Sequence, residues 1–152
     1  MNPTVFFICT GNVCRSPLAE AFFNRMAEQT GLLLRAASAG LSPAAPSPSN
    51  GTLQVAAEYG LDLSGHRPRA LSAEMVSQAR HLLTMTWDDS EEVVRRFPPS
   101  AGKVATMLGL GCGDEEIREP QTGDLEEYRW CARTIEEAVV RVVEFLRLPP
   151  PS

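Results

Sequence analysis

The segment CTGNVCRS, residues 9–16, collects residue types that could bind and attack a phosphate group. Cys9 is a potential nucleophile, and the planar guanidinium of Arg15 can bind two phosphate oxygens at once. Between them, Gly11 and Asn12 suit the positive φ angles that let successive backbone N–H groups turn inward around an anion. The pattern therefore predicts an oxyanion cradle with a thiol at its mouth.

The residues on either side of this segment predict how it is positioned. The continuous apolar run TVFFI, residues 4–8, is typical of a buried parallel strand. The segment SPLAEAFFNRMAEQTG predicts a helix in which Ser16 is the N-cap, Pro17 is the first helical residue and Gly31 ends the helix. The cradle would therefore lie on the turn between a strand and a helix.

A turn of this kind favours anion binding and an ionised thiol. In open α/β sheets, ligands bind beyond the carboxyl ends of the strands. A helix N-terminus adds unpaired N–H groups and roughly half a positive charge. Cys9 would therefore be a thiolate in the same pocket that holds its electrophile. An isolated cysteine at a strand end is more often structural, but its spacing from Arg15 favours the catalytic interpretation.

The rest of the chain alternates between strand and helix patterns. Strands are predicted over 32–40, 81–85 and 103–107, helices over 52–60, 72–79, 88–97 and 124–148, and a proline-rich loop over 41–51. We expect a capping-box-like pair of Asp124 and Glu127 at the start of the last helix, and a solvated face for the charges of 88–97.

This alternation predicts a single three-layer α/β domain. It would have a four-stranded parallel sheet flanked by helices, with the phosphate-binding loop after strand 1. The expected domain covers residues 1–148, and a short Pro-rich tail covers 149–152.

Composition narrows the function class further. The chain has 152 residues, 43% of them hydrophobic, and a net charge of −5, with Lys103 as its single lysine. This charge argues against nucleic-acid binding, which needs clustered basic residues. No apolar stretch reaches the ~20 residues of a membrane span, so we expect no membrane association and a cytoplasmic location. In a reducing compartment the four cysteines should be free thiols: Cys9, Cys14, Cys112 and Cys131.

Residues 5–23, VFFICTGNVCRSPLAEAFF, resemble the N-terminal signature of the low-molecular-weight protein tyrosine phosphatases. The resemblance continues in SAG (38–40), YGLDLSGHRPRAL (59–71), LLTMT (82–86) and LEEYRWCARTIEEAV (125–139). It implies that Cys9 attacks phosphorus in line and forms a cysteinyl-phosphate. Arg15 and the loop residues would bind the phosphate oxygens, the loop residues being Thr10, Gly11, Asn12, Val13, Cys14 and Ser16.

The resemblance also implies supporting roles around the nucleophile. Ser16 would donate a hydrogen bond to the Cys9 sulfur. Asn12 would hold the strained loop, supported by Ser38 and His66, although residues alone favour a capped turn for His66. Cys14 could form a reversible disulfide with Cys9 that protects it from over-oxidation. The reaction implied requires no metal and no cofactor.

The segment expected to carry the general acid differs in sequence from the family pattern. The family places an aspartate in an Asp-Pro-aromatic segment, whereas this chain has REPQTGD at 118–124. Glu119 is our candidate acid, with Asp124 in reserve, although a helix cap is the commoner use of Asp124. Gln121 replaces the aromatic residue, and Trp87 could supply an aryl wall instead. For Asp114, Glu115 and Glu116 we expect solvated charge.

Several functions remain open. Val13 lacks the hydroxyl of the threonine found in the family's arginine phosphatase branch, which favours phosphotyrosine over phosphoarginine. Glu119 and Gln121 leave room for a phosphate-binding pseudophosphatase with little turnover. An arsenate reductase, less favoured, would need Cys112 or Cys131 to relay a disulfide. The expected partner is a phosphorylated protein or peptide, and the expected state is a monomer or weak dimer.

Overall fold

Four parallel strands form the centre of the molecule, as the sequence predicts. The structure is a computed structural model and describes residues 2–110 and 116–149. The sheet has the order β2-β1-β3-β4. Its strands are β1 (Val5–Cys9), β2 (Ala36–Gly40), β3 (His81–Thr84) and β4 (Val104–Thr106). All pairs are parallel, and β1 lies between β2 and β3, so the loop after β1 leaves the middle of the sheet.

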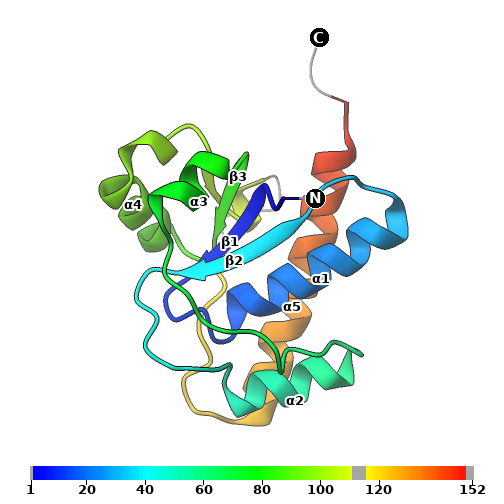
Figure 1. Cartoon of the computed structure of the whole chain (residues 1–152). Coiled ribbons are helices and arrows are strands. Elements are labelled where there is room, and N and C mark those ends of the chain that lie inside the picture. Colours follow the sequence, from blue (N-terminus) through cyan, green and yellow to red (C-terminus); the bar gives the residue numbers. More distant parts are fainter. Residues whose placement is uncertain (1, 111–115, 150–152) are drawn as a thin grey trace.

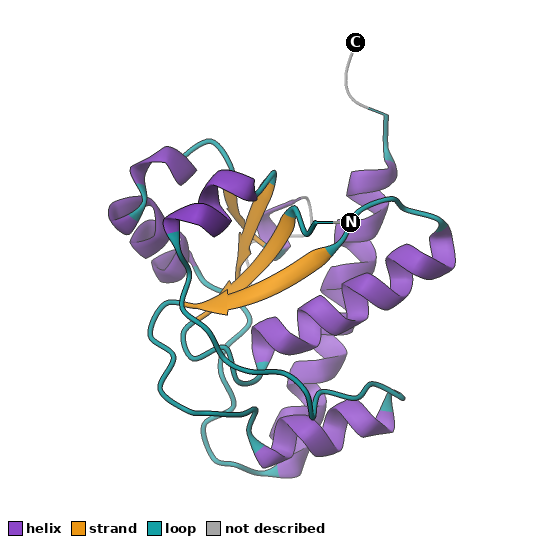
Figure 2. Cartoon of the chain, in the orientation of Figure 1, coloured by secondary structure: helices purple, strands orange, loops and turns teal. Residues whose placement is uncertain are grey.

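Helices cover both faces of this sheet (Figures 1 and 2). The two layers beside the sheet contain α1 and α5 on one face and α3 and α4 on the other, which confirms the three-layer α/β class. The helices are α1 (Arg15–Thr30), α2 (Asn50–Glu58), α3 (Ala73–Gln78), α4 (Trp87–Arg96) and α5 (Leu125–Arg147). Short 3-10 turns follow α4 and β4, at Pro98–Ser100 and Leu108–Leu110.

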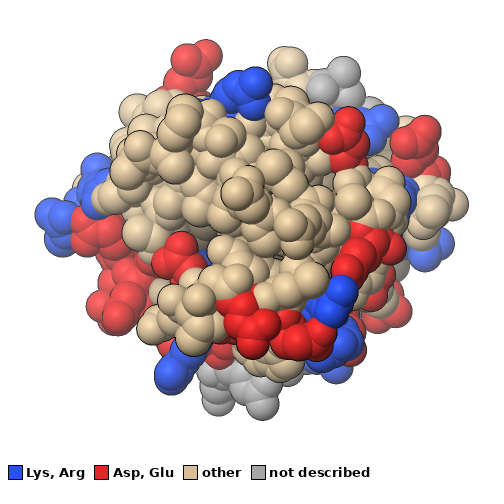
Figure 3. Space-filling view, turned by 90° about the horizontal axis from the view of Figure 1, so that it is seen from below, with Lys and Arg blue, Asp and Glu red and all other residues tan. Residues whose placement is uncertain are grey.

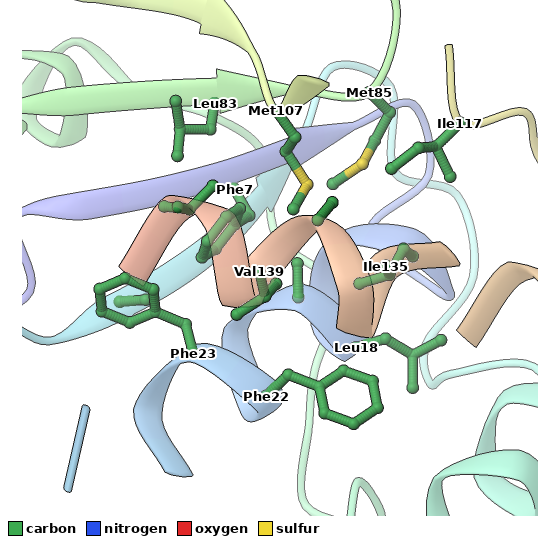
Figure 4. Packing of buried hydrophobic residues seen from close by; sticks show 14 of the residues in the cluster. Phe7, Leu18, Phe22, Phe23, Leu83, Met85, Met107, Ile117, Ile135 and Val139 are labelled. Atoms are coloured by element: carbon green, nitrogen blue, oxygen red, sulfur yellow. The ribbon is translucent and has the colours of Figure 1, made fainter. Parts of the chain in front are cut away.

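The larger core lies between the sheet, α1 and α5 (Figure 4). Leu18 and Phe22 of α1 pack in one cluster with Ile135 and Val139 of α5, and all four side chains are fully buried. Burying large aliphatic and aromatic side chains in this way contributes roughly 1.5–3 kcal/mol each. The contact fixes α1, and with it the loop that precedes α1, against α5.

Several element boundaries differ from the sequence-based prediction, most of them by one or two residues. The strand expected over 32–40 begins only at Ala36, and α2 begins at Asn50, inside the expected 41–51 loop. The predicted N-cap Ser16 is wrong, because α1 begins at Arg15 and Cys14 is its N-cap residue. Ser16 is already helical, and its hydroxyl is used by neighbours in the preceding loop.

The predicted capping box at the start of α5 is also wrong. Asp124 does cap the helix, accepting a hydrogen bond from the Glu126 N–H. However, the Glu127 carboxylate accepts from the N–H groups of Gln121 and Thr122 instead of returning to Asp124. Glu127 therefore fixes the segment before α5.

The charges of α4 are not all solvated, contrary to the prediction. Asp89, in its first turn, is only 8% exposed. Its backbone N–H donates to the cap residue Thr86, while its Oδ2 atom is buried and has no hydrogen-bond partner among the described residues. A buried carboxylate of this kind carries a desolvation cost.

Charges of both signs share the surface of the protein. On the face in Figure 3, acidic and basic side chains alternate around the edge, while neutral residues fill the centre. Within residues 2–110 and 116–149, no helix combines the length and the apolar character that crossing a membrane requires.

Candidate active site

The loop between β1 and α1 places the Cys9 sulfur among hydrogen-bond donors. The backbone N–H of Asn12 points at Cys9 Sγ, at 3.3 Å from nitrogen to sulfur, and Ser16 Oγ lies 2.9 Å from the same sulfur. Cys9 itself is 2% exposed. The loop is tied to the chain after β2 because Leu41 N–H donates to the Cys9 carbonyl and Ser42 N–H to the Thr10 carbonyl.

Asn12 holds this loop in a conformation that few residues adopt. It is the single non-glycine residue of positive φ among the described residues, at 57°. Its side-chain Nδ2 donates to Ser16 Oγ at 2.8 Å and to Ser38 Oγ at 3.0 Å, and its Oδ1 accepts from Arg69 N–H at 3.1 Å. Every hydrogen-bonding group of this buried amide is used, which stabilises the left-handed backbone.

Ser16 links Asn12 to the Cys9 sulfur. Ser16 Oγ accepts a hydrogen bond from Asn12 Nδ2 and lies 2.9 Å from Cys9 Sγ, and either of the last two atoms can be the donor between them. A thiolate at Cys9 would accept hydrogen bonds from both the Ser16 hydroxyl and the Asn12 N–H, whereas a thiol would donate to Ser16 Oγ. The arrangement can therefore accommodate a negative charge on sulfur.

Ser38 and His66 extend the network outward from Asn12. Ser38 accepts from Asn12 Nδ2 and donates to Glu20 Oε1 at 2.8 Å. The His66 ring Nε2 lies 3.0 Å from the Asn12 carbonyl oxygen. Both residues lie beside Asn12, where the resemblance places them.

Arg15 connects the loop to a distant segment of the chain. Its side chain is 4% exposed, its Nη1 donates to the Ile117 carbonyl at 3.0 Å, and its Nη2 lies 4.0 Å from Glu119 Oε2. Ile117 N–H in turn donates to the Met85 carbonyl just after β3. The structure thus brings Cys9, Arg15 and the candidate acid Glu119 to one end of the sheet.

Two exposed tryptophans lie near the segment that contains Glu119. The backbone N–H of Trp87 donates to Glu116 Oε1, so Glu116 is not simply a solvated charge. Trp130 of α5 was not among the residues picked out from the sequence, where it lies within an amphipathic helix and carries no local signal. A cavity of about 320 Å³ is lined by Arg118, Glu119, Pro120, Gln121, Glu127 and Trp130.

Asp89 is a second residue that sequence reasoning missed. Burial raises the pKa of its carboxyl group, while the positive charge of Arg15 partly opposes that rise. Arg15 is therefore close enough to act on the carboxyl group electrostatically. Its place in a charged helix pattern gave no sign of burial.

Cys14 is buried in the same core cluster as Cys131. The Cys131 thiol, and then the Thr52 hydroxyl and Arg15, lower the pKa of Cys14 against the opposing effect of burial. Conversely, its interaction with Cys14, together with burial, raises the pKa of Cys131. Cys9, Cys14 and Cys131 are free thiols, as predicted.

The remaining predicted residues take other places. Thr10 is exposed, and Gly11 and Val13 are half-buried. Asp124 is exposed and caps α5. Three residues weighed from the sequence, Cys112, Asp114 and Glu115, lie outside the described residues. The described residues contain no group of three or more His, Cys, Asp or Glu side chains placed to hold a metal ion.

Comparisons with known proteins agree with this geometry. The family model described as low molecular weight phosphotyrosine protein phosphatase matches residues 4–148. A protein-arginine-phosphatase of Geobacillus stearothermophilus is 32% identical over 145 residues, covering 94% of this chain and 95% of the relative. A probable low molecular weight protein-tyrosine-phosphatase, EpsP, of Ralstonia nicotianae is 31% identical over 140 residues, covering 91% and 92%.

A solved structure adds information on a related active site. It is a cysteine-to-serine mutant of the YwlE arginine phosphatase with a phosphorylated active-site serine. It is 26% identical to this chain, with a TM-score of 0.88 and coverage of 93% of each chain. Together with the loop and its Cys9–Arg15 spacing, these matches show that the chain belongs to the low molecular weight phosphotyrosine protein phosphatase family.

Proposed function

We propose that this protein hydrolyses phosphotyrosine in proteins or peptides through a cysteinyl-phosphate on Cys9. The observation that carries the proposal is the surroundings of the Cys9 sulfur, which receives a hydrogen bond from Asn12 N–H and lies 2.9 Å from Ser16 Oγ, beside a buried Arg15. These groups stabilise an anionic nucleophile and leave it positioned for attack.

In the first step, the Cys9 sulfur attacks phosphorus and the bond to the tyrosine oxygen breaks. The guanidinium of Arg15 is held in place by the Ile117 carbonyl, so it binds two equatorial oxygens without first having to be ordered. The backbone of Thr10, Gly11, Asn12, Val13 and Cys14 completes the phosphate site. The related cysteine-to-serine structure with a phosphorylated serine supports a covalent intermediate of this kind.

Glu119 is the proposed general acid. Its carboxyl group is half-exposed and lies 4.0 Å from Arg15, at the edge of the phosphate site. It would protonate the leaving oxygen in the first step. In the second step it would take a proton from the water that attacks the cysteinyl-phosphate.

The surroundings of Glu119 support an aryl leaving group. Trp130 and Pro120 line the same cavity as Glu119, and Trp87 is attached to the same segment through Glu116. The Trp130 ring offers a flat apolar wall for a tyrosine ring, and we expect Trp87 to supply a second one. In contrast, Val13 offers no hydroxyl to a guanidinium. The free Cys9 thiol also suits a reducing compartment such as the cytoplasm.

The test measures release of phosphate from one peptide sequence that carries either phosphotyrosine or phosphoarginine. We expect kcat/KM to be at least about tenfold higher for phosphotyrosine, which corresponds to roughly 1.4 kcal/mol. A preference for phosphoarginine would contradict the proposal and would indicate a protein arginine phosphatase, as the Geobacillus relative is named.

Two cysteine variants complete this test. Cys9→Ser should abolish release, whereas Cys131→Ser, a buried cysteine outside the phosphate site, should keep wild-type rates in the presence of a reductant. If wild type releases no phosphate from either peptide yet still binds inorganic phosphate, the protein is a pseudophosphatase and the proposal fails.

A further inference from the structure

The segment that carries Glu119 forms neither a helix nor a strand. Residues 116–124 lead to the start of α5 as irregular backbone (Figure 1). Glu119 lies near the middle of this segment, and its side chain is 48% exposed. A general acid must nevertheless lie within hydrogen-bond reach of the leaving oxygen. The position of Glu119 therefore depends on the hydrogen bonds that anchor the segment on either side of it.

The first anchor lies two residues before Glu119. Ile117 is fully buried, its backbone N–H donates to the Met85 carbonyl at 3.0 Å, and its carbonyl accepts from Arg15 Nη1 at 3.0 Å. These hydrogen bonds fix the start of the segment against the sheet and against the arginine that binds phosphate. They leave the direction of the chain after Ile117 to be set by a second anchor.

The second anchor is the carboxylate of Glu127, which binds the segment just after Glu119. Glu127 Oε1 accepts from Gln121 N–H at 2.6 Å, and Oε2 accepts from Thr122 N–H at 3.0 Å and from the Thr122 hydroxyl. The Thr122 hydroxyl, followed by the two backbone N–H groups, lowers the pKa of Glu127. Within the part of the chain that the structure describes, no other side chain accepts from a backbone N–H of residues 118–123.

The side chain of Glu127 is not needed to begin α5. Asp124 caps this helix, because its side chain accepts from Glu126 N–H and its carbonyl accepts from Glu127 N–H. The neighbouring carboxylate of Glu126 pairs with Arg129 on the same helix and does not bind the segment. Of these acidic residues at the start of α5, Glu127 is the one whose side chain reaches back towards the candidate acid.

We propose that Glu127 is a positioning residue for the general acid, and that its carboxylate holds Glu119 where a leaving oxygen can be protonated. Pro120 joins Glu119 to Gln121, and its ring fixes its φ angle, so a shift of Gln121 is passed on to Glu119. Glu119, Gln121 and Glu127 also line the same cavity. The inference rests on the proposed function, with Glu119 as the acid, and adds the residue that places this acid.

The first test compares two phosphate esters. Benzyl phosphate has a poor leaving group that must be protonated, whereas p-nitrophenyl phosphate has a good one. Glu127→Gln keeps the size of the side chain, but its amide nitrogen cannot accept a hydrogen bond. We expect kcat/KM to fall at least about tenfold for benzyl phosphate and less than about threefold for p-nitrophenyl phosphate. Both esters are assayed on one sample, so a loss of folded protein leaves their ratio unchanged.

Two controls separate this role from a general effect on the site. Glu126→Gln removes the neighbouring carboxylate, whose exposed ion pair with Arg129 contributes little, and should keep the wild-type ratio of the two esters. The inhibition constant of inorganic phosphate should not change in Glu127→Gln, because the phosphate loop keeps its contacts. A loss of phosphate binding as large as the loss of kcat/KM would overturn the proposal, since Glu127 would then act on the loop.

A double variant tests whether Glu127 acts through Glu119. In a Glu119→Gln background no acid remains to be placed, so adding Glu127→Gln should lower kcat/KM for benzyl phosphate by less than about twofold. Additive losses would overturn the proposal. A wild type that hydrolyses neither ester would contradict the proposed function itself. An active wild type whose ratio is unchanged in Glu127→Gln would contradict the role of Glu127 alone.

Discussion

Single side chains set the chemistry of this site, and Asn12 shows how closely they are matched. Its left-handed backbone brings its N–H to the Cys9 sulfur, while its side chain donates to Ser16 Oγ, which lies 2.9 Å from the same sulfur. The Asn12 amide also donates to Ser38 Oγ and accepts from Arg69 N–H. One residue thereby contacts the nucleophile directly and holds its other neighbour, Ser16.

The role of Glu119 as general acid can be tested by varying the leaving group. Glu119→Gln should lower kcat by about 10²–10⁴ for a phosphate ester with a poor, alkyl-like leaving group, because that oxygen must be protonated as it leaves. The loss should be much smaller for a good aryl leaving group such as p-nitrophenolate. Asp124→Asn, at the cap of α5, is the comparison variant. Equal losses of Glu119→Gln on both esters would remove Glu119 from this role.

At the scale of elements, the site depends on segments that pass unusually close to one another. The loop after β1 crosses the end of β2 at Gly40, where an added Cβ would lie 2.8 Å from the Thr10 carbonyl oxygen and 3.1 Å from the Asn12 Cβ. The start of α5 brings Trp130 beside the acid segment. The lack of a side chain at Gly40 and the indole of Trp130 therefore both shape the pocket.

Gly40→Ala should damage the phosphate loop more than the fold. The new methyl group meets backbone atoms that cannot rotate away, so the loop must move, and overpacking of this kind costs about 1–3 kcal/mol. A displacement of about 1 Å can cost on the order of a hundredfold in kcat/KM. Gly65→Ala, which meets nothing within 4 Å, is the control for assays of activity and melting. Wild-type kcat/KM in Gly40→Ala would show that this close approach is irrelevant to catalysis.

Trp130→Ala should weaken recognition of aryl phosphates. Aromatic contacts contribute about 0.5–1.5 kcal/mol beyond burial, so we expect a rise in KM of roughly two- to tenfold for phosphotyrosine peptides. An alkyl phosphate should be affected much less, because it has no ring to stack. The same pair of substrates with Trp87→Ala identifies which of the two walls contacts the ring. No change in either variant would mean that neither indole binds substrate.

At the level of the whole molecule, the order of the strands in the sheet determines where the site lies. Because β1 lies between β2 and β3, the segments that follow these strands converge on the loop after β1. The bond from Arg15 to the Ile117 carbonyl joins residues 102 positions apart in the chain. The same convergence buries Asp89 near Arg15, which links the stability of the fold to pH.

Asp89→Asn should reduce the loss in the free energy of unfolding that occurs as pH rises. Burial raises the pKa of Asp89, so this group favours the folded state at pH values below about 3.8, its ordinary value, and the contribution is lost as pH rises through the raised value. Asparagine has no such loss. The free energy of unfolding, measured in urea at pH 3.5 and pH 7, should therefore shift in favour of the variant as pH rises.

Asp62 provides a control of opposite sign for this measurement. Its hydrogen bonds from Ser64 lower the pKa of Asp62, so its contribution is present above its ordinary value and is lost as pH falls. The free energy of unfolding of Asp62→Asn, relative to that of wild type, should therefore fall as pH rises. If both variants follow the wild-type pH dependence, Asp89 does not couple stability to pH.

The amino-acid sequence was sufficient to predict the alternating strands and helices, the parallel sheet and the loop that carries Cys9 and Arg15. These features depend on local properties: apolar periodicity, residues that break helices, and the backbone preferences of Gly11 and Asn12. Such properties are encoded within a few neighbouring residues. Helix boundaries were predicted less accurately: Ser16 lies inside α1 and not at its cap, and its hydroxyl hydrogen-bonds within the preceding loop.

Contacts between distant residues of the site could not be predicted from the sequence. Three features depend on strand order and on the packing of α4 and α5: the approach of Glu119 to Arg15, the position of Trp130 beside the acid segment and the burial of Asp89. No local pattern encodes them, because Glu119 lies in a segment without helix or strand, and Trp130 and Asp89 each fit an exposed or a buried helix position equally well. Contacts across the sheet assign them their places.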